Sequence, residues 1–126
     1  MSSFDPTATY VHLSAANDAI AVPVTEAFWP ELMAGERDYD GRLITAHEIS
    51  ENMSHWERHP AGGEVLLAMS GAFDVILDEP GGERRIALDA GRAVIVPRGT
   101  WHRVEVRQPG KLVFITPGEG TAHRPV

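Results

Sequence analysis

From Gly41 onward the chain is a series of short runs rich in apolar and β-branched residues, separated by residues that favour tight turns. The separators PAGG, SG, EPGG, DAG, PRG and QPG each contain glycine, proline or both. About eight runs recur at a spacing of roughly 8–12 residues, which is typical of an antiparallel sandwich or barrel. The runs are GRLITAHEIS, SHWERH, EVLLAMS, FDVILD, RRIAL, AVIVP, WHRVEV and KLVFITP. The pattern therefore predicts an all-β fold.

The alternation within the runs predicts which side chains share a face. Successive side chains of a strand point to opposite faces, so every second residue lies on the same side. In GRLITAHEIS this places four residues on one face: Leu43, Thr45, His47 and Ile49. The runs VLLAM and AVIV are apolar on consecutive residues, which indicates strands covered on both faces.

Residues 1–40 have a different pattern of apolar and polar residues from the rest of the chain. They predict a short strand at Val22–Val24 and a brief helix at Thr25–Ala34, with Gly35 ending the helix. We expect residues 1–40 to form an N-terminal extension that packs on a barrel of residues 41–126. That barrel includes an extended C-terminal tail, and the 126 residues fit one domain.

Composition and charge exclude several classes of function. The net charge of −7 argues against nucleic acid or an anionic membrane as a partner, because both are themselves negative. The chain has no cysteine, which excludes disulfides, zinc-thiolate sites and thiol nucleophiles. No apolar stretch approaches the ~20 residues needed to cross a bilayer, and no signal peptide is visible. We therefore expect a cytoplasmic protein.

The segment SHWERHPAGGE, residues 54–64, concentrates groups that can bind a metal ion. In an extended chain, His55, Glu57 and His59 point to one side of the strand. Glu64 begins the next run after the turn PAGG, and a later turn, PRG, leads into the run that carries His102. Imidazoles and carboxylates that share one face are the ligand types that divalent metals use.

Two spacings connect these residues with glycine and proline positions. The first is His59-x4-Glu64-x6-Gly71, and the second, GRAVIVPRGTWH, has the form Gly-x5-Pro-x-Gly-x2-His and ends at His102. Both spacings resemble the two conserved motifs of the cupin superfamily, over roughly residues 41–117. The resemblance implies a double-stranded β-helix, or jelly-roll, barrel. Only the final asparagine of the second motif is missing, because Val106 stands there.

The first motif departs from the family at two positions. Glu51 stands where the family has glycine, and Glu57 stands where it has the first of its histidines. Cupins usually hold a metal with three histidines and one glutamate, so the resemblance implies that His59, Glu64 and His102 are ligands. The fourth place falls to Glu57, or to His55 if the strand is shifted by one pleat.

The implied ligands indicate a kind of metal. Two imidazoles and one carboxylate with open positions are the arrangement of non-haem Fe(II) centres. Adding Glu57 raises the number of oxygen donors in the site, which favours Mn(II) or Fe(II) but does not exclude Zn or Ni. The expected cofactor is therefore a divalent metal ion.

The resemblance leaves two functions open. Similar proteins include dioxygenases and isomerases, which implies a metalloenzyme acting on a small molecule, and other small cupins bind or sense a small molecule without chemistry. We expect a homodimer, by analogy of fold. We also expect Trp56 and Trp101 to serve in packing or at a dimer interface, and the tail with His123 to fold over the barrel mouth or to reach a second subunit. The expected pocket is lined by Leu66, Phe73, Val94 and Val104.

Overall fold

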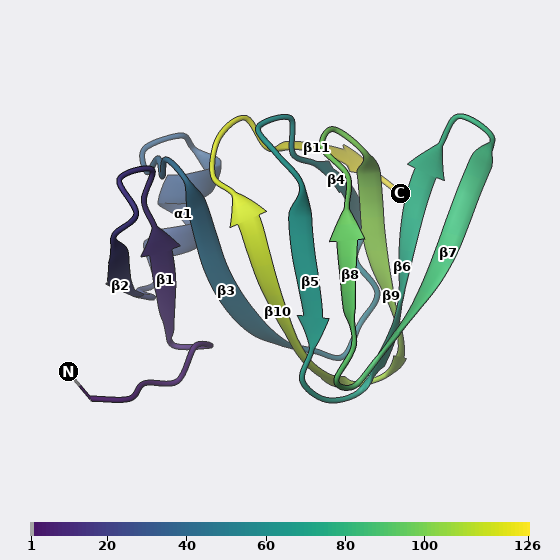
Figure 1. Ribbon diagram of the computed structural model, residues 1–126, viewed down its shortest axis with the longest axis horizontal. Coiled ribbons are helices and arrows are strands. Elements are labelled where there is room, and N and C mark those ends of the chain that lie inside the picture. The colour runs from purple at the N-terminus through teal and green to yellow at the C-terminus, as the bar shows by residue number, and fades with distance from the viewer. Residues whose placement is uncertain (1) are drawn as a thin grey trace.

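The computed structural model of the protein describes residues 2–126, whose regular structure is mostly β-strand (Figure 1). Among these residues one short helix, α1 (Phe28–Met33), follows the first two strands. The strands are β1 (Thr9–Leu13), β2 (Ala19–Pro23), β3 (Arg42–Ile49), β4 (His55–Arg58), β5 (Glu64–Ala68), β6 (Ala72–Glu79), β7 (Gly82–Asp89), β8 (Ala93–Val96), β9 (Trp101–Gln108), β10 (Gly110–Pro117) and β11 (Ala122–Pro125).

The strands form two antiparallel sheets. One has the order β2-β1-β3-β10-β5-β8, and the other has the order β11-β4-β9-β6-β7. Three strand pairs are nested around the β6–β7 hairpin: β5–β8, β4–β9 and β3–β10 follow it outward, and successive pairs alternate between the sheets. A long hairpin rolled up in this way is a jelly roll. The predicted fold class is therefore confirmed.

The ends of the chain add strands that the pattern of apolar residues did not predict. Strand β1 was not predicted because TYVHL alternates without a continuous apolar face. The strand predicted at Val22–Val24 lies closer to the N-terminus, as β2 (Ala19–Pro23). The helix begins at Phe28 and not at Thr25. Strand β11 pairs with β4 of the same chain, so the tail adds an edge strand to the second sheet.

The main core lies between the two sheets. Its largest members, Phe73, Leu66 and Leu88, are fully buried. A second, smaller cluster joins Tyr10 of β1, Phe28 of α1 and Leu43 of β3. Because β1 also pairs with β3, the N-terminal segment is attached through both backbone and side chains. In Figure 1, α1 lies beside β1 and β3, at the end of the molecule opposite β6 and β7.

Within residues 2–126, no helix has the length and apolar character needed to cross a membrane.

We predict that Gly71 limits substitution more than Gly91, although both glycines have a left-handed backbone, with φ of 79° and 82°. A Cβ at Gly71 would lie 2.7 Å from the carbonyl oxygen of Gln108, whereas a Cβ at Gly91 meets nothing within 4 Å. Gly71→Ala should cost about 3 kcal/mol or more of unfolding free energy, and Gly91→Ala about 1 kcal/mol. Urea denaturation of the two variants measures the difference. Equal losses would contradict the steric role of Gly71.

Candidate metal centre

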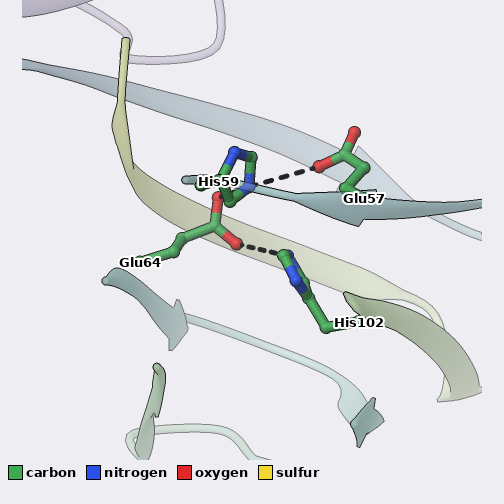
Figure 2. Close-up of side chains that lie close together, drawn as sticks. All are labelled: Glu57, His59, Glu64 and His102. Atoms are coloured by element: carbon green, nitrogen blue, oxygen red, sulfur yellow. Dashed lines mark hydrogen bonds and ion pairs between the residues drawn. The ribbon is translucent and has the colours of Figure 1, made fainter. Parts of the chain in front are cut away.

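The structure brings Glu57, His59, Glu64 and His102 together between the two sheets. One donor atom from each lies within 4.8 Å of the other three. Figure 2 shows the side chains converging from β4, from the segment just after it, and from the starts of β5 and β9. Three of them are almost fully buried, with exposed fractions of 3% for His59, 1% for Glu64 and 2% for His102.

The distances within the group suit a bound divalent ion. Nε2 of His102 lies 2.8 Å from Oε1 of Glu64, and Nε2 of His59 lies 3.1 Å from its Oε2. Oε2 of Glu57 lies 3.7 Å from Nε2 of His59. Ligand bonds of about 2.1 Å at right angles place neighbouring donor atoms about 3.0 Å apart. The contacts of Glu64 with the two histidines have about this separation, and Glu57 lies further away, so the four residues form a group that could hold one ion.

Hydrogen bonds at the far side of each imidazole determine which nitrogen faces the group. Nδ1 of His102 donates to the carbonyl oxygen of Thr100 at 2.9 Å. In a neutral ring this leaves Nε2 with a lone pair, pointing at a carboxylate oxygen that also carries lone pairs. Two such atoms at 2.8 Å repel unless a proton or a metal ion lies between them. The site is therefore built to hold positive charge.

His59 is oriented in a similar way. Its Nδ1 lies 2.9 Å from the hydroxyl oxygen of Thr121, and its Nε2 is buried without a hydrogen bond among the described residues. A buried nitrogen without a partner is costly unless a ligand satisfies it. Thr116 donates a hydrogen bond of 2.6 Å to Oε2 of Glu64. Partners of this kind fix the orientation of metal ligands.

The two motif turns are joined directly, which explains why their spacing matters. Gly99 has a φ of 71°, and its N–H donates to the carbonyl oxygen of His59 at 3.0 Å. The Pro97–Gly99 turn therefore holds the chain next to His59 just before β9 begins. Glu57 pairs with His102 in the register of β4 and β9. Backbone contacts thus bring the two motifs together before any side chain is considered.

Burial and hydrogen bonding shift the pKa of Glu64, the acid at the centre of the group, in opposite directions. Burial raises the pKa of Glu64, but the hydrogen bond with His102 and the close approach of His59 outweigh it, so the pKa falls to about 2. Burial also lowers the pKa of His102, and its hydrogen bond to Glu64 more than offsets this, so the net pKa is raised. In the metal-free protein, a proton on His102 accompanies the ionised Glu64.

The structure separates the alternatives that the sequence left open. His55 is exposed, with Nδ1 2.9 Å from the Ser54 hydroxyl, and it lies outside the group that contains Glu57. His47 also lies outside the group and contacts aromatic rings. His123, in the tail, lies 3.3 Å from Glu57 through its Nε2 and Oε1. No motif marks His123, and only its pairing with Glu57 across β11 and β4 reveals its place.

A cavity of about 580 Å³ opens onto Glu57, His59 and Glu64. The prediction of which residues line the pocket was wrong. The residues expected there fill the main core between the sheets: Leu66, Phe73, Val94 and Val104. The residues predicted to share one face of the first run all line the cavity: Leu43, Thr45, His47 and Ile49. The remaining wall comes from α1 and the segment after it, from β10 and from His123.

Trp56 and Trp101 lie away from the cavity and stack with arginines. The guanidinium of Arg124 lies 4.5 Å from the ring centre of Trp101 and 5.3 Å from that of Trp56. Arg58 and Arg103 cover the two rings as well. Neither tryptophan is among the residues that line the cavity, which agrees with the packing role expected for both.

Comparison with known proteins agrees with the resemblance seen in the sequence. Residues 47–118 match the family model described as "Cupin domain". A cupin-2 domain containing protein from Shewanella frigidimarina is 20% identical, with a TM-score of 0.53 over 64% of this chain and 74% of that chain. A search of curated proteins found no match.

Two enzymes share the fold at similarly low identity. Oxalate decarboxylase from Bacillus subtilis is 20% identical, with a TM-score of 0.58 over 70% of this chain and only 24% of its own. That protein has Mn(II) centres. Hydroquinone 1,2-dioxygenase from Sphingomonas sp., with 4-hydroxybenzoate bound, is 22% identical, with a TM-score of 0.52 over 63% of this chain and 60% of its own. At such identities the likeness shows the fold alone.

We predict that the stability of the metal-free protein falls at both ends of the pH range. The raised pKa of His102 stabilises the fold below the ordinary value of 6.5, and this contribution is lost as the pH rises through the folded value. The lowered pKa of Glu64 stabilises the fold above 4.5, and this contribution is lost as the pH falls toward about 2. Thermal melting in the presence of a chelator measures both. His102→Gln should lack the alkaline loss, and an unchanged alkaline slope in that variant would contradict the assignment.

Proposed function

The chain belongs to the cupin family, since the family model matches more than half of it, and on this premise we propose that it is a metal-dependent enzyme acting on a small molecule. The reaction that we propose is of the oxygenase or isomerase type. One observation carries the proposal: the buried carboxylate of Glu64 lies between two imidazole nitrogens, at the end of a cavity of about 580 Å³. Metal sites that do chemistry need this access for a substrate.

We propose His59, Glu64 and His102 as metal ligands, with Glu57 as the fourth. Nitrogen and oxygen donors without thiolate favour Fe(II) or Mn(II), and they also accept Zn(II) or Ni(II). The Mn(II) centres of the oxalate decarboxylase that shares this fold support the same choice. When bound, such an ion supplies Lewis acidity toward substrate oxygens and, for a redox metal, electron exchange with O₂.

The surrounding residues prepare the site for that role. The carbonyl of Thr100 and the hydroxyl of Thr121 hold the two imidazole rings so that each Nε2 faces Glu64. Thr116 holds the carboxylate in place. Because these supports are part of the folded strands and turns, the ligands need little rearrangement when a metal binds. Burial of three of the four side chains excludes bulk water from one side of the site.

One observation favours a second candidate, a cupin that binds or senses a small molecule without chemistry. Glu57 replaces a family histidine, is 27% exposed, and is 3.7 Å from His59 but 3.3 Å from His123. A carboxylate shared with a neighbouring imidazole is a weaker ligand than a buried histidine. A site with only three firm ligands would still bind a metal and a small molecule.

We predict that the protein, purified without added metal, carries about one equivalent of iron or manganese. Glu64→Gln and His102→Ala should lower the affinity for Mn(II) at least about 100-fold, because even the loss of a residue that only supports a ligand costs 10–100-fold. His55→Ala is the matched control and should leave the affinity unchanged, since His55 lies outside the group. Elemental analysis and calorimetric titration provide the measurements. A folded wild-type protein that binds no divalent metal would disprove the proposed site.

Turnover separates the two candidate functions. We expect the Fe(II)-loaded protein to consume O₂ or to convert the substrate when supplied with a catechol or a β-diketone, since both present oxygen donors to the site. His102→Ala should abolish the reaction. An oxygen electrode and NMR of the substrate follow the two kinds of chemistry. Tight binding of these compounds without any conversion would favour the binding protein instead.

A further inference from the structure

We infer that the substrate of the proposed metal site has an apolar, ring-sized body and one oxygen-donor head with at most a single negative charge. This inference rests on the proposed function and narrows it to a class of molecule. Two features of the structure lead to it: the apolar walls of the cavity and the electrical balance at its metal-binding end.

The cavity has apolar walls and an apolar roof above the donor group. Side chains of α1 form the roof through Trp29, Leu32 and Met33, and side chains of β3 and β10 form a wall through Leu43, Ile49 and Phe114. The family model matches residues 47–118, so the roof lies outside the matched region. The roof is therefore a feature of this chain that the shared fold does not supply.

His47 belongs to the apolar wall although histidine is polar. Its ring lies 5.6 Å from that of Trp29 and 5.7 Å from that of Phe114, and its edge also contacts Tyr10. Burial lowers the pKa of His47, which keeps the imidazole neutral. The cavity thus offers three neighbouring aromatic rings to a ligand, and rings of this kind pack best against another flat apolar group.

The charges around the cavity disfavour a dianion. Glu57 and Glu64 together carry two negative charges, which balance a divalent ion, whereas the family's set of three histidines and one glutamate leaves one positive charge. Among the described residues that line the cavity, Arg37 is the one arginine or lysine, and its Nε already donates to Glu31 at 2.6 Å. A dianionic ligand would therefore bring two uncompensated charges into an apolar space, which is costly.

The test compares two chelators that share a head group and differ in their body. Benzohydroxamate and acetohydroxamate present the same two oxygen donors, one attached to a phenyl ring and the other to a methyl group. With the Mn(II)-loaded protein of residues 1–126, benzohydroxamate should bind about 50-fold tighter, because the ring removes on the order of 100 Å² more apolar surface from water. Calorimetric titration measures both affinities.

Substitutions at two residues of similar exposure test whether the roof causes the preference for the phenyl ring. Trp29 is 39% exposed and lines the cavity, whereas Phe4 is 42% exposed and lies outside it. Trp29→Ala should reduce the phenyl preference to less than about 10-fold, and Phe4→Ala should leave it unchanged. If Trp29→Ala fails to fold, Met33→Asp replaces it, with Met69→Asp as its control, since both methionines are exposed and only Met33 lines the cavity.

Oxalate tests the charge argument with the same protein. We expect it to bind more weakly than benzohydroxamate, and Glu57→His to strengthen oxalate binding about 10-fold by removing a negative charge a few ångströms away. Equal binding of the two hydroxamates, or tighter binding of oxalate than of benzohydroxamate, overturns the inference and leaves the metal site standing.

Absence of metal binding would bear on the proposed function and not on the class of ligand. If the protein takes up no metal, the proposed function falls, and saturation-transfer NMR of the metal-free protein decides the class of ligand. Transfer to the phenyl ring of benzohydroxamate that Trp29→Ala abolishes supports an apolar ring-sized body. Lack of transfer in the wild-type protein overturns it.

Discussion

A carboxylate that is 1% exposed carries a full negative charge at the centre of this protein, and the surrounding structure compensates it. An isolated buried charge is strongly unfavourable, so Glu64 requires polar partners on both of its oxygens. His102, whose pKa is raised, faces one oxygen, and Thr116 donates a hydrogen bond to the other, which also lies 3.1 Å from Nε2 of His59. Because those imidazoles are themselves fixed by groups behind them, the compensation depends on backbone positions several residues away. Stabilising the buried carboxylate of Glu64 thus constrains the conformation of two turns and three strands.

The jelly roll meets these requirements through its topology. Nested strand pairs that alternate between the sheets place the start of β5 in one sheet next to the start of β9 in the other. Glu64 and His102 therefore meet across the interior although 38 positions separate them. The hydrogen bond from Gly99 to His59 ties the same two regions through the backbone. A site held by both sheets is as rigid as the packing between them, so the four side chains form a preformed group and need not assemble when an ion binds.

The sequence predicted most of this because the relevant information is local. Period-two alternation gives the facing of each strand, and glycine and proline give the turns, so the all-β class could be predicted. The grouping of His59, Glu64 and His102 was implied by the resemblance to the cupin motifs, which left the fourth place open between Glu57 and His55. The cavity could not be predicted: Leu66 and Phe73 were expected to line it but lie in the main core, because the sequence does not show which part of the interior is filled by side chains. The pairing of β11 with β4 was also out of reach, because a polar edge strand carries no apolar signal.

That edge strand helps to explain how Glu57 can replace a histidine. In the register of β11 and β4, His123 lies opposite Glu57, and its Nε2 is 3.3 Å from the carboxylate. The imidazole absent from position 57 is thus present on the adjacent strand, where it lies beside the carboxylate and outside the group of four. The exchange lowers the charge of the proposed metal site without leaving a carboxylate unpaired at the cavity wall. The same pair of residues thus links the charge of the proposed metal site to the register of the C-terminal strand.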